Sequence, residues 1–269
     1  MIGVFDSGYG GLTILKELLK KLPQYDYFYL GDNARAPYGT RNKETIIQFA
    51  EEAVEYLFQQ GCVLIIIACS TASSNALRSL QEKYLRQPKI TNRKILGIIK
   101  PQAEEAVQIT KNGNIGVVGT SATIRSESFD IELKHLKPDV KVYKQACPLI
   151  VPLIEEHWHK KPETRMILKK YLQHLKTCNI DTLILGCTHY PFLFREFQRI
   201  MGKNVRVLPP GEIVAKSLEN YLIRHPEIED LLEKKQQCFF ATTDDPKKFK
   251  TMGSEFLSQN MGEVQKITL

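Results

Sequence analysis

The sequence contains the same short pattern twice, and this repeat limits the possible folds more than any other feature. In each half an apolar run ends in a small polar residue, at Ile2–Ser7 in the first half and Ile115–Thr120 in the second. A later apolar run in each half ends in a cysteine, at Leu64–Cys69 and Thr182–Cys187. Two strand–helix units repeated at similar spacing indicate a duplicated half-domain. Chance similarity between two such units is the alternative.

Short β-branched runs alternate with longer amphipathic segments along the whole chain. This alternation predicts the α/β class, with parallel sheets covered by helices on both faces. We predict strands at Ile2–Asp6, Tyr25–Leu30, Val63–Ala68, Lys94–Ile99, Asn114–Gly119, Val140–Tyr143, Asp181–Gly186, Val205–Leu208 and Cys238–Thr242. We predict helices at Asn42–Gln59, Ser74–Leu85, Glu163–Thr177 and Gly211–Leu222.

The polar residues that end the repeated runs should meet in one place. In open parallel sheets, ligands bind beyond the carboxyl ends of the strands, where loops and helix N-termini converge. If the two halves face each other, Cys69 and Cys187 point into one shared cleft from opposite sides.

The composition of the chain limits the kinds of binding partner and the cellular compartment that we expect. The longest apolar run, Cys62–Cys69, is shorter than the roughly 20 residues of a membrane helix, and no export signal opens the chain. We therefore expect the six cysteines to lie in a reducing cytoplasm, without a membrane partner. The net charge of +7 is compatible with nucleic acid or with anionic ligands. The lysines are scattered and no arginine-rich arm occurs, so a lysine-rich surface is favoured over nucleic-acid binding.

The two cysteines suggest acid–base chemistry at a single carbon. A thiol at a helix N-terminus can have its pKa lowered from about 8.5 towards neutrality, and it then works as a base. A racemase needs one group to remove the Cα proton and another to return a proton from the opposite face. Cys69 and Cys187 fit that need, because both end a strand and precede hydroxyl residues. The alternative for any single buried cysteine is an inert core residue.

Asp6 and His189 are the natural partners of the two thiols. Asp6 ends the strand next to the one that carries Cys69, and His189 follows Cys187 closely. Asp6 could instead cap a helix starting near Gly11, and His189 could be a hydrogen-bonded core residue. Zinc binding at Cys187 and His189 is disfavoured, because a structural site needs four ligands and the sequence offers poor candidates for the others.

Two loops at strand ends could contact a ligand. The glycine-rich turn Asp6–Gly11 matches no complete nucleotide-binding motif, so its amides are better suited to a carboxylate. The long loop Gly31–Thr40 has the composition of a substrate lid as much as of a plain connection.

Five ordered motifs together resemble the glutamate racemase family over nearly the whole chain. They are Phe5–Leu12, Gly31–Gly39, Ala68–Ala72, Cys147–Glu155 and Leu185–Pro191. The resemblance implies a racemase that supplies D-glutamate for peptidoglycan, works without pyridoxal phosphate or metal, and forms a homodimer. It also implies two domains, residues 1–94 plus 207–269 and residues 95–206, with the active site in the cleft between them.

The resemblance also implies roles for single residues. Cys69 should act on D-glutamate and Cys187 on L-glutamate, with Asp6, His189 and Glu155 assisting; Glu156 is the alternative to Glu155. Substrate contacts would come from Asp6, Ser7, Pro37, Tyr38, Gly39, Ser70, Thr71, Thr120, Thr123, Thr188 and His189.

The chain departs from the family pattern at two places. Ser70 follows the first cysteine where the family usually has Asn, so a substrate contact could be lost or bridged by water. The segment Gly97–Ala103 carries Lys100 and Gln102 where smaller or acidic residues are expected. These departures leave open a racemase acting on aspartate or another acidic amino acid. A catalytically silent binding or regulatory protein, with a nucleic-acid-related partner, is the alternative from another class.

Overall fold

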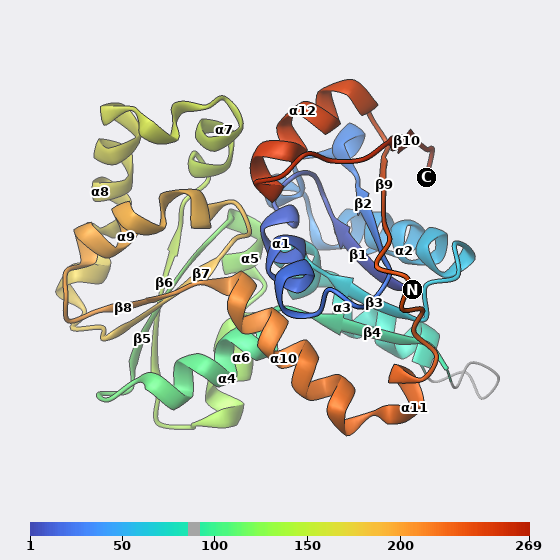
Figure 1. Ribbon diagram of the computed structural model, residues 1–269. Coiled ribbons are helices and arrows are strands. Elements are labelled where there is room, and N and C mark those ends of the chain that lie inside the picture. Colours follow the sequence, from blue (N-terminus) through green and yellow to red (C-terminus); the bar gives the residue numbers. More distant parts are fainter. Residues whose placement is uncertain (86–91) are drawn as a thin grey trace.

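The computed structural model describes residues 1–85 and 92–269. Two open sheets lie side by side, and every strand pair in them is parallel (Figure 1). The first sheet has six strands in the order β10-β9-β2-β1-β3-β4. Its strands are β1 Ile2–Asp6, β2 Tyr27–Gly31, β3 Leu64–Ile67, β4 Lys94–Gly97, β9 Cys238–Thr242 and β10 Val264–Lys266.

The second sheet has four strands in the order β6-β5-β7-β8. They are β5 Asn114–Gly119, β6 Lys141–Ala146, β7 Thr182–Gly186 and β8 Arg206–Leu208. Its order repeats that of β2-β1-β3-β4 in the first sheet, so β5 takes the place of β1 and β7 that of β3. This agreement fits the duplication predicted from the sequence, and the predicted two-sheet α/β class is confirmed.

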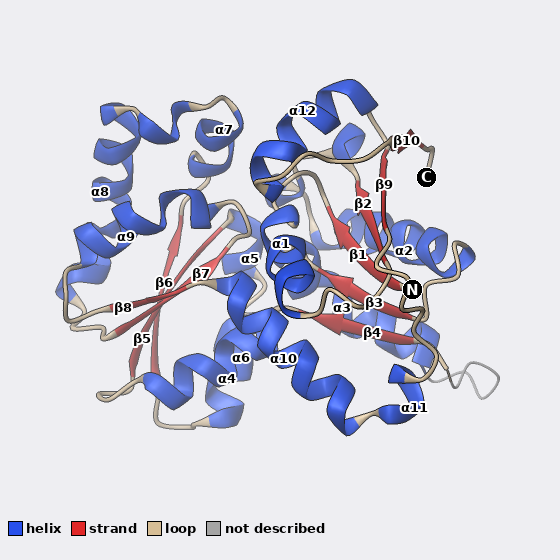
Figure 2. Cartoon of the chain, in the orientation of Figure 1, coloured by secondary structure: helices blue, strands red, loops and turns tan. Residues whose placement is uncertain are grey.

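Helices cover both faces of each sheet (Figure 2). The helices of the first half and the segment after β8 are α1 Leu12–Lys21, α2 Lys43–Gln59, α3 Ser70–Leu85, α10 Pro210–Arg224, α11 Pro226–Glu229 and α12 Pro246–Leu257. Those of the second half are α4 Ile99–Ile109, α5 Ser121–Arg125, α6 Ser128–Leu136, α7 Ile150–Glu155, α8 Pro162–Thr177 and α9 Phe194–Met201. Short 3-10 helices occur at η1 Asn33–Arg35, η2 Tyr38–Thr40, η3 Trp158–Lys160 and η4 Tyr190–Leu193.

The alternation of side chains along each strand explains this layering. Val4 packs with α1, α10 and α12, whereas its neighbour Phe5 packs with α2 and α3 on the opposite face. Because both faces are covered, β3 is a continuous run of buried residues rather than an alternating one. In the second half, α4 and α6 cover one face of the sheet and α8 and α9 the other.

Two connections join the halves. One leads from β4 into α4, and the other from β8 into α10. The predicted domain limits at residues 94 and 207 fall inside these strands, since β4 runs to Gly97 and β8 to Leu208. The exact division into domains remains a prediction, but each connection lies within a few residues of it.

Several helices and strands have different bounds in the structure from those predicted. The helix expected from Ser74 begins at Ser70, and β6 ends at Ala146 rather than Tyr143. Strand β10 was not predicted, because it is a short edge strand of half-buried and exposed residues that lacks an apolar pattern. None of the described helices is long and apolar enough to cross a bilayer.

Candidate functional site

A cavity of about 400 Å³ lies at the carboxyl ends of the central strands and is lined by both halves of the chain. Both cysteines singled out from the sequence line it. So do ten other predicted site residues: Ser7, Pro37, Tyr38, Gly39, Ser70, Thr71, Thr120, Glu155, Thr188 and His189. Asp6 and Thr123 lie behind this lining. The structure therefore brings the predicted site residues together.

Cys69 sits between β3 and α3. Its carbonyl accepts from the Ser73 backbone N–H at 2.7 Å, and its sulfur receives the Ala72 N–H at 3.4 Å. The thiol therefore caps the helix, which explains why α3 begins earlier than predicted. Ser7 Oγ lies 3.3 Å from Cys69 Sγ and comes from the end of the neighbouring strand β1.

The surroundings of Cys69 do not lower its pKa, which corrects the expectation from the sequence. The side chain is only 5% exposed, and this burial raises the pKa of the thiol to about 12. The nearby Asp6 raises it further, while the contacts with Ser7 and the Ala72 amide oppose the rise. Desolvation of a charged sulfur thus outweighs the hydrogen bonds from Ser7 and Ala72, and Cys69 is a protonated thiol at neutral pH.

Cys187 has a different set of neighbours. It directly follows β7, and the chain then forms η4 and reaches α9 only at Phe194, so Cys187 is not at an α-helix N-terminus. Its sulfur instead lies 4.0 Å from Nδ1 of His189. The other ring nitrogen of His189, Nε2, is 2.9 Å from Glu155 Oε1. These three side chains form a chain of contacts along the cavity wall.

His189 is held as a cation by this chain. Burial lowers the pKa of the imidazole, but the contacts with Cys187 and Glu155 outweigh burial and raise the pKa to about 10. His189 is only 6% exposed, so little water screens its charge. Glu155, rather than Glu156, makes this contact and lines the cavity.

Asp6 links the two halves from behind the cavity. Its carboxylate accepts the Gly8 N–H at 2.8 Å and the Thr188 hydroxyl at 3.4 Å. Burial raises the pKa of Asp6, whereas His189 opposes the rise. The backbone amide of Gly11, the N-cap residue of α1, also lowers the pKa of Asp6, so Asp6 interacts with the start of this helix as well as with the cavity wall.

Three threonine hydroxyls form a buried contact across the halves. Thr71 Oγ1 lies 2.9 Å from Thr120 Oγ1 and 3.4 Å from Thr123 Oγ1, and the last two are 3.0 Å apart. Thr123 reaches the cavity only through its two partners, so its predicted substrate contact would be indirect. Ser70 Oγ, in contrast, is buried without a hydrogen-bond partner among the described residues and is free to meet a ligand.

The loop Gly31–Thr40 lines the cavity but is firmly held. Asp32 is fully buried and accepts bonds from Arg35 Nε at 2.7 Å, from Thr243 Oγ1 at 2.8 Å and from the Tyr38 hydroxyl. These contacts fix Pro37, Tyr38 and Gly39 against the cavity. The loop is therefore a fixed wall in this structure.

Several residues that line the cavity were not predicted from the sequence: Gly8, Tyr9, Asn33, Ala36, Thr40, Ser121, Pro148, Val151, Pro152, Asp244 and Lys248. Most lie in motifs that were already noted, so their place in those loops was the available signal. Asp244 and Lys248 come from the β9–α12 segment, where no sequence motif indicated a site. The unusual Lys100 and Gln102 do not line this cavity, and Gln102 Nε2 donates to the Ile98 carbonyl.

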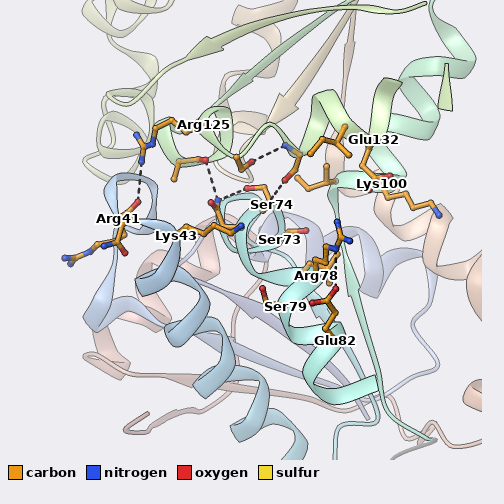
Figure 3. Close-up of a pocket in the computed structure, with 18 of the residues that line it drawn as sticks. Arg41, Lys43, Ser73, Ser74, Arg78, Ser79, Glu82, Lys100, Arg125 and Glu132 are labelled. Carbon is orange, nitrogen blue, oxygen red and sulfur yellow. Dashed lines mark hydrogen bonds and ion pairs between the residues drawn. The ribbon is translucent and has the colours of Figure 1, made fainter. Parts of the chain in front are cut away.

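A larger hollow of about 900 Å³ lies between α3 and the α5–α6 region (Figure 3). It is rich in polar groups, but its basic side chains do not converge. Figure 3 shows Arg41 and Arg125 at one end, with Arg78 and Lys100 at the other. Arg78 pairs with Glu82 at 3.4 Å, and no cysteine or histidine is among the described residues that line the hollow. The smaller cavity is therefore the better candidate for a catalytic site.

A family model, the amino-acid sequences of known proteins and solved structures all show that this chain is similar to racemases. Residues 9–218 match the family described as Asp/Glu/hydantoin racemase. The glutamate racemase of Geobacter metallireducens is 38% identical over 268 residues, covering 100% of this chain and 96% of that protein. The solved glutamate racemase of Bacillus anthracis superimposes with a TM-score of 0.91 at 34% identity, covering 100% of this chain and 97% of that one. The Francisella tularensis glutamate racemase, solved in complex with D-glutamate, gives a TM-score of 0.89 at 34% identity, with coverages of 99% and 97%.

Proposed function

The chain belongs to the Asp/Glu/hydantoin racemase family, and we propose on that basis that it interconverts L- and D-glutamate by two-base proton transfer between Cys69 and Cys187. The observation that carries the proposal is the placement of the two cysteines. They follow equivalent strands of the two sheets, β3 and β7, and line the same cavity. Relatives named glutamate racemase that match the chain over its full length support glutamate as the substrate.

The proposed reaction breaks and forms one C–H bond. With L-glutamate, the Cys187 thiolate takes the Cα proton, and the electron pair of the C–H bond remains on Cα as a planar carbanion. The Cys69 thiol then gives its proton to the opposite face of Cα, which leaves Cys69 as thiolate and Cys187 as thiol. With D-glutamate the roles are exchanged, so atoms and charge balance in both directions.

The different surroundings of the two sulfurs support this assignment. His189, with its pKa raised to about 10, places a positive charge 4.0 Å from the sulfur of Cys187. Glu155 orients the imidazole through Nε2. Cys69 is protonated at neutral pH and is thus a proton donor for the L-to-D direction. Asp6 holds Thr188 and the Gly8 amide in place in the cavity wall.

The polar lining suits an amino acid. We assign the α-carboxylate and α-amino group to the hydroxyl-bearing residues Ser7, Ser70, Thr71, Thr120 and Thr188, with the Pro37–Gly39 loop closing the wall. The unpaired Ser70 hydroxyl replaces the amide that the family usually has there and can still give one hydrogen bond. The proposal needs neither pyridoxal phosphate nor a metal ion.

Isotope transfer from D₂O tests both the substrate and the mechanism. Purified protein should convert L-glutamate to D-glutamate, and deuterium should appear in the product before it appears in the remaining L-glutamate. This order follows because the proton that leaves and the one that arrives use different sulfurs. Equal early labelling of both enantiomers would indicate a single base. Absence of D-glutamate would reject the activity, and faster labelling of aspartate would change the substrate.

We further propose that the enzyme supplies D-glutamate for peptidoglycan in the cytoplasm and acts as a homodimer. The support is the family to which the chain belongs. Rescue of a bacterial strain that requires external D-glutamate would test the cellular role, and sedimentation velocity would test the dimer. Failure to rescue, despite racemisation in vitro, would separate the cellular role from the chemistry.

A further inference from the structure

A buried phenylalanine near the end of α12 packs against the imidazole of His189. Phe256 is 3% exposed, and its ring lies edge-on to that of His189, with the ring centroids 5.4 Å apart and the planes at 79°. Phe256 is not among the described residues that line the cavity with the two thiols, whereas His189 is. The phenyl ring therefore contacts the cationic side chain of the site from behind the cavity wall.

Phe256 is held in place by neighbours from both halves of the chain. Its ring centroid lies 4.4 Å from that of Phe192 and 5.8 Å from that of Tyr9. The preceding residue, Glu255, pairs through Oε2 with His157 Nδ1 at 3.3 Å, which joins the end of α12 to the turn after α7. These contacts leave the phenyl ring little room to turn away from the imidazole.

Phe256 also lines a second, smaller hollow. This space of about 250 Å³ lies between α1, η4, the start of α10 and the end of α12, and we call it the α12 hollow. His189 does not line it, so the phenyl ring separates the imidazole from it. The charged residues that line the α12 hollow are Lys16, Glu17, Glu212 and Glu255. Three of these four are carboxylates, which are groups that attract an imidazolium ion.

The contacts of His189 on the cavity side depend on the direction in which its ring points. Nδ1 lies 4.0 Å from Cys187 Sγ and Nε2 lies 2.9 Å from Glu155 Oε1, and the third titratable group that interacts with the ring is Asp6. The contacts with Cys187 and Glu155 raise the pKa of His189 although burial opposes them. A ring that turned towards the α12 hollow would lose both contacts.

We propose that Phe256 is a positioning residue, which keeps His189 turned towards Cys187 and Glu155 and separates it from the α12 hollow. The effect on turnover rests on the proposed racemisation, because Phe256 acts through His189 and touches neither the substrate nor the reacting atoms. Loss of the phenyl ring should therefore lower kcat and leave KM nearly unchanged, since the residues that line the cavity remain.

The titration of His189 tests this role directly, without any need for activity. Nuclear magnetic resonance of protein labelled with ¹³C-histidine can follow the imidazole, and the signal missing in His189→Gln assigns it. The buried surroundings of His189 raise its pKa on balance to about 10, so entry of water should return it towards 6.5. In Phe256→Ala the pKa should fall by at least about one unit, a tenfold loss of proton affinity.

Turnover gives the second measurement. Phe256→Ala should lower kcat about tenfold in both directions, with KM within about twofold of the wild type. Phe256→Leu fills most of the space with another apolar side chain, so it should recover most of the kcat and of the His189 pKa. It also keeps the proposal testable if Phe256→Ala does not fold.

Phe58→Ala is the matched control. Phe58 is 5% exposed and lies edge-on to Tyr84, with ring centroids 5.5 Å apart, so it is another buried phenylalanine with an aromatic partner. It lies in α2 and is not among the described residues that line the cavity or the α12 hollow. Its loss should lower stability while leaving kcat and the titration of His189 as in the wild type.

Two results would overturn the role of Phe256. One is a folded Phe256→Ala or Phe256→Leu variant that titrates at His189 as Phe58→Ala does, and with the same kcat. The other is a rise in KM at unchanged kcat, which would mean that the ring supports substrate binding instead. A wild-type protein that racemises no glutamate would overturn the proposed function, whereas the titration would still show whether Phe256 holds His189 in place.

Discussion

At the scale of single residues, the two sulfurs are alike in sequence but different in surroundings. Both are 5% exposed. Cys69 has a raised pKa and a hydroxyl neighbour, whereas Cys187 has a cationic imidazole beside it. The duplication predicted that they would share a site. It could not predict their different electrostatics, because those depend on Asp6, Glu155 and burial, which only the folded chain brings together.

Replacement of either thiol tests the two-base assignment. We expect Cys69→Ser and Cys187→Ser each to lower kcat for racemisation by at least about 100-fold, because a serine hydroxyl is a far weaker base at neutral pH. Cys178→Ser is the control, since Cys178 lies outside the cavity. Chiral chromatography of the products measures the rates, and circular dichroism checks the fold. Full turnover in either active-site variant would contradict the assignment.

His189 should make stability depend on pH. Its pKa in the folded protein is raised to about 10 from the ordinary 6.5, so the folded state holds the proton more tightly. The resulting stabilisation is complete below about pH 6.5 and disappears as the pH rises towards about 10. The free energy of unfolding in urea should therefore differ most between wild type and His189→Gln at pH 6. A difference that grows towards pH 10 would contradict the cationic state of His189.

At the scale of elements, the turn before α1 fits tightly against the segment after β7. A Cβ atom at Gly10 would lie 2.3 Å from Thr188 Oγ1 and 2.5 Å from His189 Nδ1. Gly10→Ala should therefore displace Thr188 and His189 and lower racemisation at least about tenfold, with a loss of about 1–3 kcal/mol in unfolding free energy. Gly262→Ala is the control, because no atom lies within 4 Å of its added Cβ. Unchanged activity in Gly10→Ala would show that the contact is easily relieved.

Asp32 joins three elements and should be important for stability. It is buried and accepts bonds from Arg35, Tyr38 and Thr243. Asp32→Ala leaves these donors without their partner, so we expect a loss of about 3 kcal/mol in the free energy of unfolding. Urea denaturation measures the loss, with the exposed Asp139→Ala as control. Equal stability of the two variants would mean that water replaces the carboxylate.

The helices and strands also show which parts of the fold could be predicted from sequence patterns. Continuous apolar runs located most central strands, because both faces of each sheet are buried. The helix start at Ser70 was missed because it depends on the Cys69 cap. The place of Lys248 was missed because it depends on β9 pairing with β2, a contact between residues far apart in sequence.

At the scale of the whole molecule, the cavity wall comes from both halves, so a bound substrate should hold them together. Ligands that bind only the folded state raise its stability by mass action. D-glutamate at about 100 times its Kd should raise Tm by about 5 °C, measured by differential scanning fluorimetry. D-alanine, which lacks the second carboxylate, should have a smaller effect at the same concentration. An equal shift with both compounds would argue against recognition of the side chain.

The order of the strands has a consequence for synthesis on the ribosome. Strand β2 lies between β1 and β9, yet β9 begins only at Cys238, after the entire second sheet has been made. Until then the nascent chain has an uncovered edge at β2, a site where unwanted pairing with other chains can start. The second half, whose strands are contiguous from β5 to β8, can complete its own sheet earlier. The part of the protein made first is therefore the last to be finished.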